Sequence, residues 1–136
     1  MLRILATGLA LIAASGQALA CTAVDIIAAD KTMIAGRTME WAFDMQWTLK
    51  SVPKGTELTL TAPPELKLPE QKVATKYSFV GISAEVFPGG AFIEGQNAAG
   101  LGVSGNFLPG FTQYQTVTKD DKDYVSVLGA GAFVLG

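Results

Sequence analysis

The sequence predicts an α+β domain made mostly of antiparallel strands, with one helix at the C-terminal end. The chain has 136 residues, 49% of them apolar, which is enough for one small domain with a core. Short segments rich in β-branched and small residues alternate with turn signals, a pattern typical of antiparallel strands. Near the end of the chain the acidic run "TKDDKDY" precedes an apolar stretch, which is typical of the start of a helix.

The first predicted element is a β-hairpin. Residues 22–29 are rich in β-branched and small residues and predict one strand, and residues 32–41 predict its partner. The three residues Ala29-Asp30-Lys31 between them are expected to form the turn. After Val52 the chain carries residues that exclude long regular elements. These are Pro53, Gly55, Pro63, Pro64 and Pro69.

The next predicted elements are one more strand and an antiparallel pair. Residues 75–83 ("TKYSFVGIS") predict the strand, and "FPGG" at 87–90 predicts a turn. Residues 91–94 and 101–107 are expected to pair antiparallel around the sequence "GQNAAG".

The last predicted element is a helix over residues 124–135. Residues 118–124 offer acidic residues for its N-cap and first turn. The helix contains Gly129 and Gly131, and the chain stops at Gly136 on an apolar surface. A natural domain seldom ends inside an uncapped hydrophobic element, so we expect the chain to be an N-terminal fragment of a longer protein.

Residues 1–20 predict a secretory signal peptide. Arg3 supplies the positive charge, and residues 5–14 form an apolar stretch that is too short to span a membrane. The small residues expected at positions −3 and −1 of the cleavage site are Ala18 and Ala20. We therefore expect a secreted or periplasmic protein whose mature domain comprises residues 21–136, without a membrane association once the signal is removed.

Composition excludes several classes of function. The net charge is −2 and there is no basic run, which gives no electrostatic reason to expect a nucleic-acid partner. The chain has no histidine and one cysteine, so it lacks the residues for a zinc site, a Ser-His-Asp triad or an internal disulfide. No metal is expected.

The single cysteine, Cys21, directly follows the predicted cleavage site and has three interpretations. It is a small buried residue that begins a strand, or a lipidated anchor, or the first residue of the mature chain. A lipid anchor usually has leucine at position −3, where this chain has Ala18. As the first residue, the cysteine would carry its own base, because an α-amino group has a pKa of about 7.7–8.0.

Two charged residues are predicted near this cysteine. A hairpin that turns near residue 30 brings position 37 back close to residue 23, so Arg37 is expected within reach of Cys21. A guanidinium there would favour the thiolate, and the carboxylate of Glu40 is placed to hold the amine. The alternative is that Arg37 and Glu40 are a solvated cross-strand ion pair.

Four motifs in order resemble the choloylglycine hydrolase family, the linear-amide C–N hydrolases of the N-terminal nucleophile superfamily. They are "CTAV" at 21–24, "GRTMEW" at 36–41, "TKYSFVGISA" at 75–84 and "EGQNAAGLGVSGNFLPG" at 94–110. The family includes penicillin V acylases and bile salt hydrolases. Trp41, directly after the acidic residue, is more similar to the Gram-negative penicillin acylase branch.

The resemblance implies a fold and catalytic roles. It implies the N-terminal part of a four-layer αββα sandwich, with Cys21 as nucleophile and its α-amine as base. It implies that Arg37 stabilises the thiolate and that Glu40 binds the amine, although the family usually has aspartate there. It also implies an oxyanion or substrate residue at Asn106 or Phe107. In a strand these two side chains face opposite ways, so Asn106 suits an oxyanion and Phe107 an apolar pocket.

The resemblance also implies a substrate class. Trp41 and Phe107 are candidates for the wall around an acyl group, with core packing as the alternative for each. The expected partner is a small-molecule amide with an apolar acyl group, such as a phenoxyacetyl penicillin, an N-acyl homoserine lactone or a conjugated bile acid. No cofactor is expected. The protein could form a homo-oligomer.

The family's members are longer than this chain and use a second asparagine and a second arginine that have no counterpart here. We therefore expect the 136-residue chain alone to be inactive or poorly folded. The alternatives are a periplasmic structural or binding β-domain, including a lipoprotein with an inert cysteine, and an amidase similar to acid ceramidase that acts on larger lipid amides.

Overall fold

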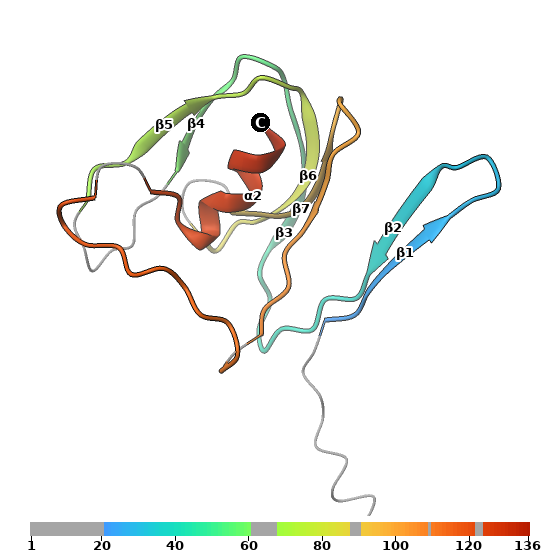
Figure 1. Ribbon diagram of the computed structural model, residues 1–136, viewed down its shortest axis with the longest axis horizontal. Coiled ribbons are helices and arrows are strands. Elements are labelled where there is room, and N and C mark those ends of the chain that lie inside the picture. The colour runs from blue at the N-terminus through green and yellow to red at the C-terminus, as the bar shows by residue number, and fades with distance from the viewer. Residues whose placement is uncertain (1–20, 61–67, 88–90, 109, 122–123) are drawn as a thin grey trace, which may run out of the picture. The chain divides into compact units, whose positions relative to one another are not determined.

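The computed structural model describes residues 21–60, 68–87, 91–108, 110–121 and 124–136. The chain divides into two compact units, one ending at Trp41 and the other spanning Ala42–Gly136. The described residues form mostly antiparallel strands with one helix at the C-terminal end, as predicted (Figure 1). The predicted signal peptide and most of the "FPGG" turn lie outside the described residues. No helix in the described part is long and apolar enough to cross a membrane.

The first unit contains the predicted hairpin. Strands β1 (Ala23–Ile27) and β2 (Met33–Arg37) pair antiparallel, and their register runs from Ala23 opposite Arg37 to Ile27 opposite Met33. The turn is held by Asp30, whose Oδ1 accepts a hydrogen bond from the backbone N–H of Thr32 at 2.9 Å. The hairpin prediction is confirmed, but both strands are shorter than predicted and β2 ends at Arg37 rather than at residue 41.

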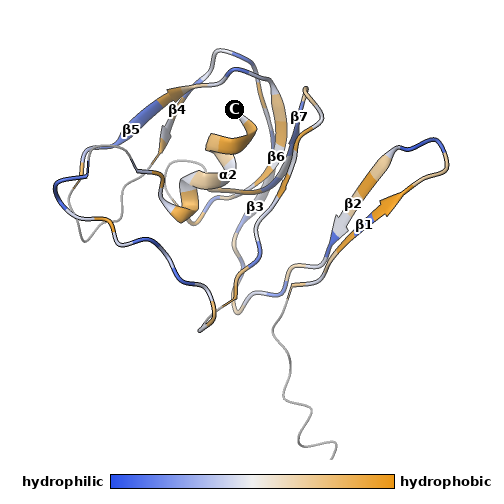
Figure 2. Ribbon diagram, in the orientation of Figure 1, coloured by the Kyte–Doolittle hydropathy of each residue, from blue (hydrophilic) through white to orange (hydrophobic). Residues whose placement is uncertain are grey.

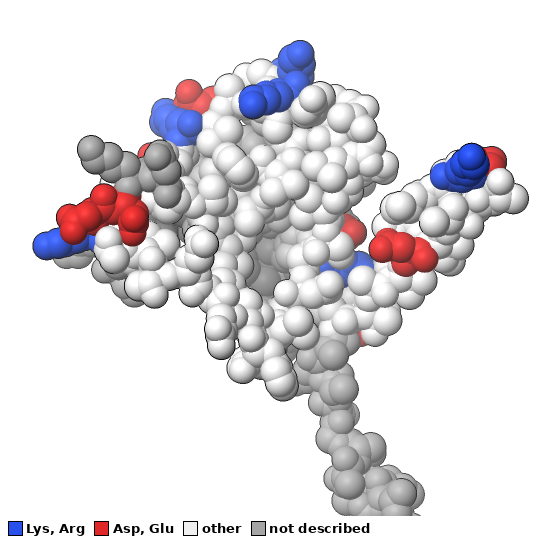
Figure 3. Space-filling view, in the orientation of Figure 1, with Lys and Arg blue, Asp and Glu red and all other residues white. Residues whose placement is uncertain are grey.

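The second unit contains two antiparallel sheets. The larger sheet has the strand order β3–β6–β7–β8, and the smaller pairs β4 with β5. The strands are β3 (Trp47–Val52), β4 (Glu57–Leu60), β5 (Gln71–Ala74), β6 (Phe79–Ala84), β7 (Ala91–Asn97) and β8 (Gly102–Ser104). A salt bridge of 2.8 Å between Lys72 Nζ and Glu57 Oε1 joins β4 to β5. Charged side chains gather in small groups on a mainly uncharged surface (Figure 3).

The strand predictions for the first part of this unit need correction. Strands β3, β4 and β5 were not predicted. In β3, apolar and polar residues alternate only over Trp47–Lys50, and the buried residue is Val52, which falls outside that alternation. The strand predicted over residues 75–83 begins at Phe79 instead. The preceding segment is drawn into loop contacts, because Thr75 N–H donates to the carbonyl of Thr56 at 3.0 Å and Lys76 N–H donates to the carbonyl of Gly136.

Helix α2 (Val127–Leu135) begins three residues later than predicted and has a different cap. Ser126 is its N-cap, with Oγ accepting from Gly129 N–H at 3.1 Å, and its first turn has no acidic residue. The first part of the acidic run, residues 118–121, forms a separate turn. Asp121 Oδ2 accepts from Thr118 N–H at 2.6 Å, and this bond holds the pKa of the Asp121 carboxyl below its usual value. The Asp121 carboxylate is therefore bonded within its own turn and does not cap the helix.

The core of the second unit lies between α2, the larger sheet and Leu60 of β4. Figure 2 shows that α2 is hydrophobic along most of its length, and Leu135 at its end is fully buried. On the sheet, the rings of Phe79 and Phe92 meet edge to face with centroids 5.0 Å apart. The helix approaches β7 closely at Gly131, where an added Cβ would lie 1.9 Å from the carbonyl oxygen of Phe92. Glycine at this position is therefore what allows the helix to pack on the sheet.

Asn97 joins the end of α2 to the turn after β7. The residue is 6% exposed, and its Nδ2 donates to the carbonyl of Leu135 at 3.1 Å. Its Oδ1 accepts from the backbone N–H groups of Ala99 and Leu101, each at 3.0 Å. The asparagine in "GQNAAG" therefore has a structural role in the part of the chain that the structure describes.

We expect Asn97→Ala to lower the free energy of unfolding by about 2–3 kcal/mol, because three backbone groups in or near the core lose their partner. Urea unfolding followed by circular dichroism measures the change. Gln96→Ala is the matched control, since Gln96 is the exposed neighbour on the same strand. An equal effect of both substitutions would contradict the assigned role.

Candidate active site

Cys21 lies at the open end of the hairpin, two residues before β1. The ladder between the strands continues beyond their ends through one more pair. Thr38 N–H donates to the carbonyl of Thr22 at 2.9 Å, and Thr22 N–H donates to Thr38 Oγ1 at 3.1 Å. The next pair in this register places Cys21 opposite Met39.

The thiol and a guanidinium meet at the sulfur of Met39. Cys21 Sγ lies 3.7 Å from Met39 Sδ, and Arg37 Nη2 lies 3.5 Å from the same sulfur. Arg37 ends β2 opposite Ala23, as predicted, and its Nε also donates to the carbonyl of Thr38 at 3.3 Å. All three side chains that meet here are half-buried. The structure thus brings Arg37 and Cys21 to one thioether, where a positive charge can stabilise a thiolate.

Glu40 and Trp41 follow this cluster. Glu40 is exposed, and among the described residues its carboxylate makes no hydrogen bond or ion pair with Cys21 or Arg37. The alternative of an Arg37–Glu40 ion pair is therefore not seen in the described part of the hairpin. That Glu40 holds an α-amine stays a prediction, as does an acyl-wall role for Trp41, the last residue of the first unit.

Asn106 and Phe107 lie in the second unit, after β8. The strand predicted over residues 101–107 was too long, because β8 ends at Ser104 and the last bond to β7 runs from Gly105 N–H to the carbonyl of Ile93 at 2.7 Å. Both residues are exposed and outside the ladder. Strand alternation therefore does not determine the directions of these two side chains. Their catalytic roles stay predictions.

Met39 is the residue that sequence reasoning missed. It stands inside "GRTMEW", but no role was assigned to it. The signal was available in the hairpin register, because a ladder with residue 23 opposite residue 37 also places residue 21 opposite residue 39.

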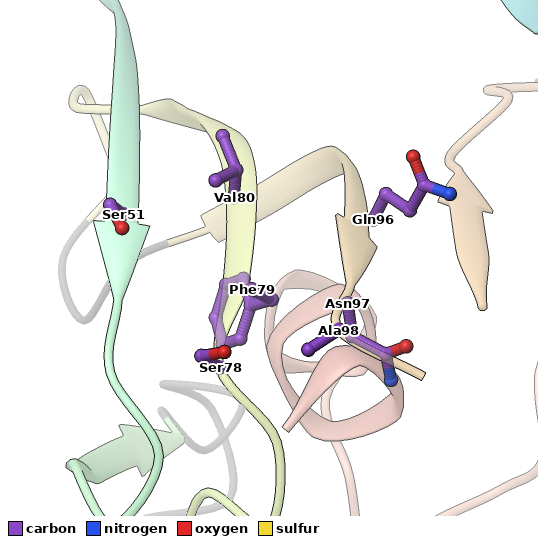
Figure 4. A pocket seen from close by; sticks show the side chains of 7 residues that line it. All are labelled: Ser51, Ser78, Phe79, Val80, Gln96, Asn97 and Ala98. Atoms are coloured by element: carbon purple, nitrogen blue, oxygen red, sulfur yellow. The ribbon is translucent and has the colours of Figure 1, made fainter. Parts of the chain in front are cut away.

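The second unit also has a hollow of about 320 Å³ near the ends of β3, β6 and β7 (Figure 4). Its lining residues are Ser51, Ser78, Phe79, Val80, Gln96, Asn97 and Ala98. None of these carries a carboxylate, an amine or a thiol, and the amide of Asn97 is already bonded to the backbone. The hollow therefore offers no general acid or base.

The sequence was compared with protein-family models, with curated proteins and with solved structures. The protein-family model described as linear amide C–N hydrolases, choloylglycine hydrolase family, matches residues 21–136. No curated protein and no solved structure gives a significant match. Because the family model covers all of the chain from Cys21 onward, the protein belongs to the choloylglycine hydrolase family of linear amide C–N hydrolases.

Proposed function

We propose that the protein hydrolyses linear amides with Cys21 as the N-terminal nucleophile of an exported enzyme. The observation that carries this proposal is that the Cys21 thiol and the Arg37 guanidinium both contact the sulfur of Met39 at the end of the hairpin. The family match, which begins at Cys21, supports the same assignment. The complete enzyme would have the four-layer αββα sandwich that the family resemblance implies.

Release of the leader would create the catalytic base. While Ala20 is attached, the nitrogen of Cys21 is a peptide nitrogen and cannot take a proton from the thiol. Cleavage after Ala20 makes it an amine with a pKa of about 7.7–8.0, so that a useful fraction is neutral near pH 7. The base and the nucleophile then belong to one residue, which suits a chain without histidine.

The reaction would follow from these groups. The neutral amine takes the thiol proton, Arg37 stabilises the thiolate, and the sulfur attacks the carbonyl carbon of the substrate amide. The tetrahedral intermediate places negative charge on its oxygen, for which Asn106 is the candidate donor in this chain. The protonated amine gives its proton to the leaving nitrogen as the C–N bond breaks, and water then hydrolyses the thioester.

The substrates would combine an apolar or aromatic acyl group with a small polar amine. Phenoxyacetyl penicillins, N-acyl homoserine lactones and conjugated bile acids fit this description. Trp41 and Phe107 are the candidate acyl contacts, and Glu40 would orient the amine of Cys21. Because the resemblance implies further catalytic residues in a longer parent, we propose that activity belongs to that parent and is low in the 136-residue chain. The loss of one oxyanion donor alone typically costs about 10²–10³ in rate.

Blocking removal of the leader is expected to eliminate the enzyme's base. Ala20→Leu places a large residue at position −1, so the exported full-length protein should keep its leader and hydrolyse an aromatic N-acyl amide at least about 10²-fold more slowly. Leu19→Ala is the matched control, because it leaves the small residues at −3 and −1 unchanged. Intact mass spectrometry identifies the first residue of each protein.

The proposal requires that the mature wild-type chain begin with an unmodified Cys21. A diacylglyceryl adduct would support the lipoprotein alternative instead. Full activity in an Ala20→Leu protein that still carries its leader would equally overturn the proposed mechanism.

A further inference from the structure

We propose that Met39 is a positioning residue, whose thioether accepts from the Arg37 guanidinium and holds it beside the sulfur of Cys21. This inference rests on the proposed function, because a positioned guanidinium matters only if the thiol reacts as a thiolate. It assigns a role to Met39, a side chain that contacts both the predicted nucleophile and the predicted cation.

The strand register explains why Met39 occupies this position. Arg37 and Met39 are two residues apart and lie on the same face of the chain as it leaves β2. Cys21 is the cross-strand neighbour of Met39, and the two sulfurs lie 3.7 Å apart. The Arg37 side chain therefore reaches the neighbourhood of the thiol along the same face, and one of its contacts is Met39 Sδ at 3.5 Å.

The chemistry of a thioether suits this role. A thioether sulfur is a weak hydrogen-bond acceptor and carries no charge. A carboxylate at the same position would also hold Arg37, but it would neutralise the guanidinium and repel a thiolate 3–4 Å away. Met39 can accept from Arg37 without adding a negative charge beside the thiol.

The contact is weak enough to be replaced during the reaction. When Cys21 loses its proton, the thiolate becomes a much stronger acceptor than the thioether, since one partner in the bond is then fully charged. The N–H group of Arg37 can transfer from Met39 Sδ to Cys21 Sγ through a small movement, because the two sulfurs are in contact. Met39 would thus hold the donor in place until the thiolate forms.

The test measures the reactivity of the thiol and does not depend on turnover. We expect Met39→Leu, which keeps the side-chain size but removes the acceptor, to make the Cys21 thiol less reactive in mildly acidic solution. Alkylation of Cys21 by iodoacetamide at pH 6.5 should slow by about three- to tenfold and should match the wild type at high pH, where the thiol is fully ionised. Two charged groups in the described part of the hairpin, Asp25 in the middle of β1 and Glu40 after β2, are unchanged in this variant.

Two further variants separate positioning from general damage to the hairpin. Met39→Gln, whose amide oxygen can accept from Arg37, is expected to restore most of the alkylation rate at pH 6.5. Met33→Leu, the same substitution at an exposed site on β2, is expected to leave the pH profile unchanged. An unchanged profile in Met39→Leu, or slowing at every pH without rescue by glutamine, would overturn the proposal. Neither result bears on whether Cys21 is the nucleophile, which its own substitutions test separately.

Discussion

Replacing Cys21 by alanine is expected to lower the rate of amide hydrolysis by about 10⁴-fold or more in the full-length enzyme, because the substitution removes the atom that attacks the substrate. Cys21→Ser keeps a nucleophilic atom in place, but the hydroxyl gives up its proton far less readily than a thiol. We expect the serine variant to lose at least about 10² in rate. Hydrolysis of an aromatic N-acyl amide, followed by release of the amine, measures both losses.

The control for these variants is to verify that the leader is removed from each of them. Alanine and serine are both small, so the leader should still be removed after Ala20, and mass spectrometry can verify the new first residue. If both processed variants retain wild-type activity, Cys21 is not the nucleophile. A structural or binding domain with an inert cysteine would then be the better interpretation.

Gly131→Ala is expected to be the most destabilising single substitution in the second unit. The added Cβ would lie 1.9 Å from the carbonyl oxygen of Phe92 and 2.9 Å from its carbonyl carbon, so either α2 or β7 must move. Because both are backbone elements, we expect a loss of about 3 kcal/mol or more in the free energy of unfolding. Thermal unfolding followed by near-UV circular dichroism measures the change.

The sign of the change in unfolding free energy distinguishes a steric clash between α2 and β7 from the intrinsic helix propensity of the residue. In an exposed helix, replacing glycine by alanine stabilises by about 1 kcal/mol. Gly129→Ala makes the same change in the same helix, but its Cβ would come no closer than 3.3 Å to Leu60 and Ser126, so it is the matched control. If Gly131→Ala proved as stable as Gly129→Ala, the close approach of α2 to β7 would be wrong.

The hairpin could be predicted because its signals are local. β-Branched residues on both sides of a three-residue turn determine the pairing, and a turn near residue 30 places Arg37 opposite Ala23. The helix start was predicted less well, because the acidic run before it resembles a cap. In the structure Asp121 instead bonds to Thr118 in a turn of its own, and Ser126 caps the helix. A local sequence pattern does not determine whether an aspartate accepts hydrogen bonds from a helix N-terminus or from a neighbouring turn.

By itself the sequence determined the hairpin, the position of Arg37 opposite Ala23 and the motifs that identify the family, since each depends on residues close together along the chain or on their order. Only the tertiary structure decided the strand order of the larger sheet, the buried role of Asn97 and the need for glycine at position 131. Two of these features join distant segments, since Asn97 bonds to Leu135 across 38 positions and Gly131 meets Phe92 across 39. Contacts at such separations follow from how side chains fill a shared core, which local propensity does not encode.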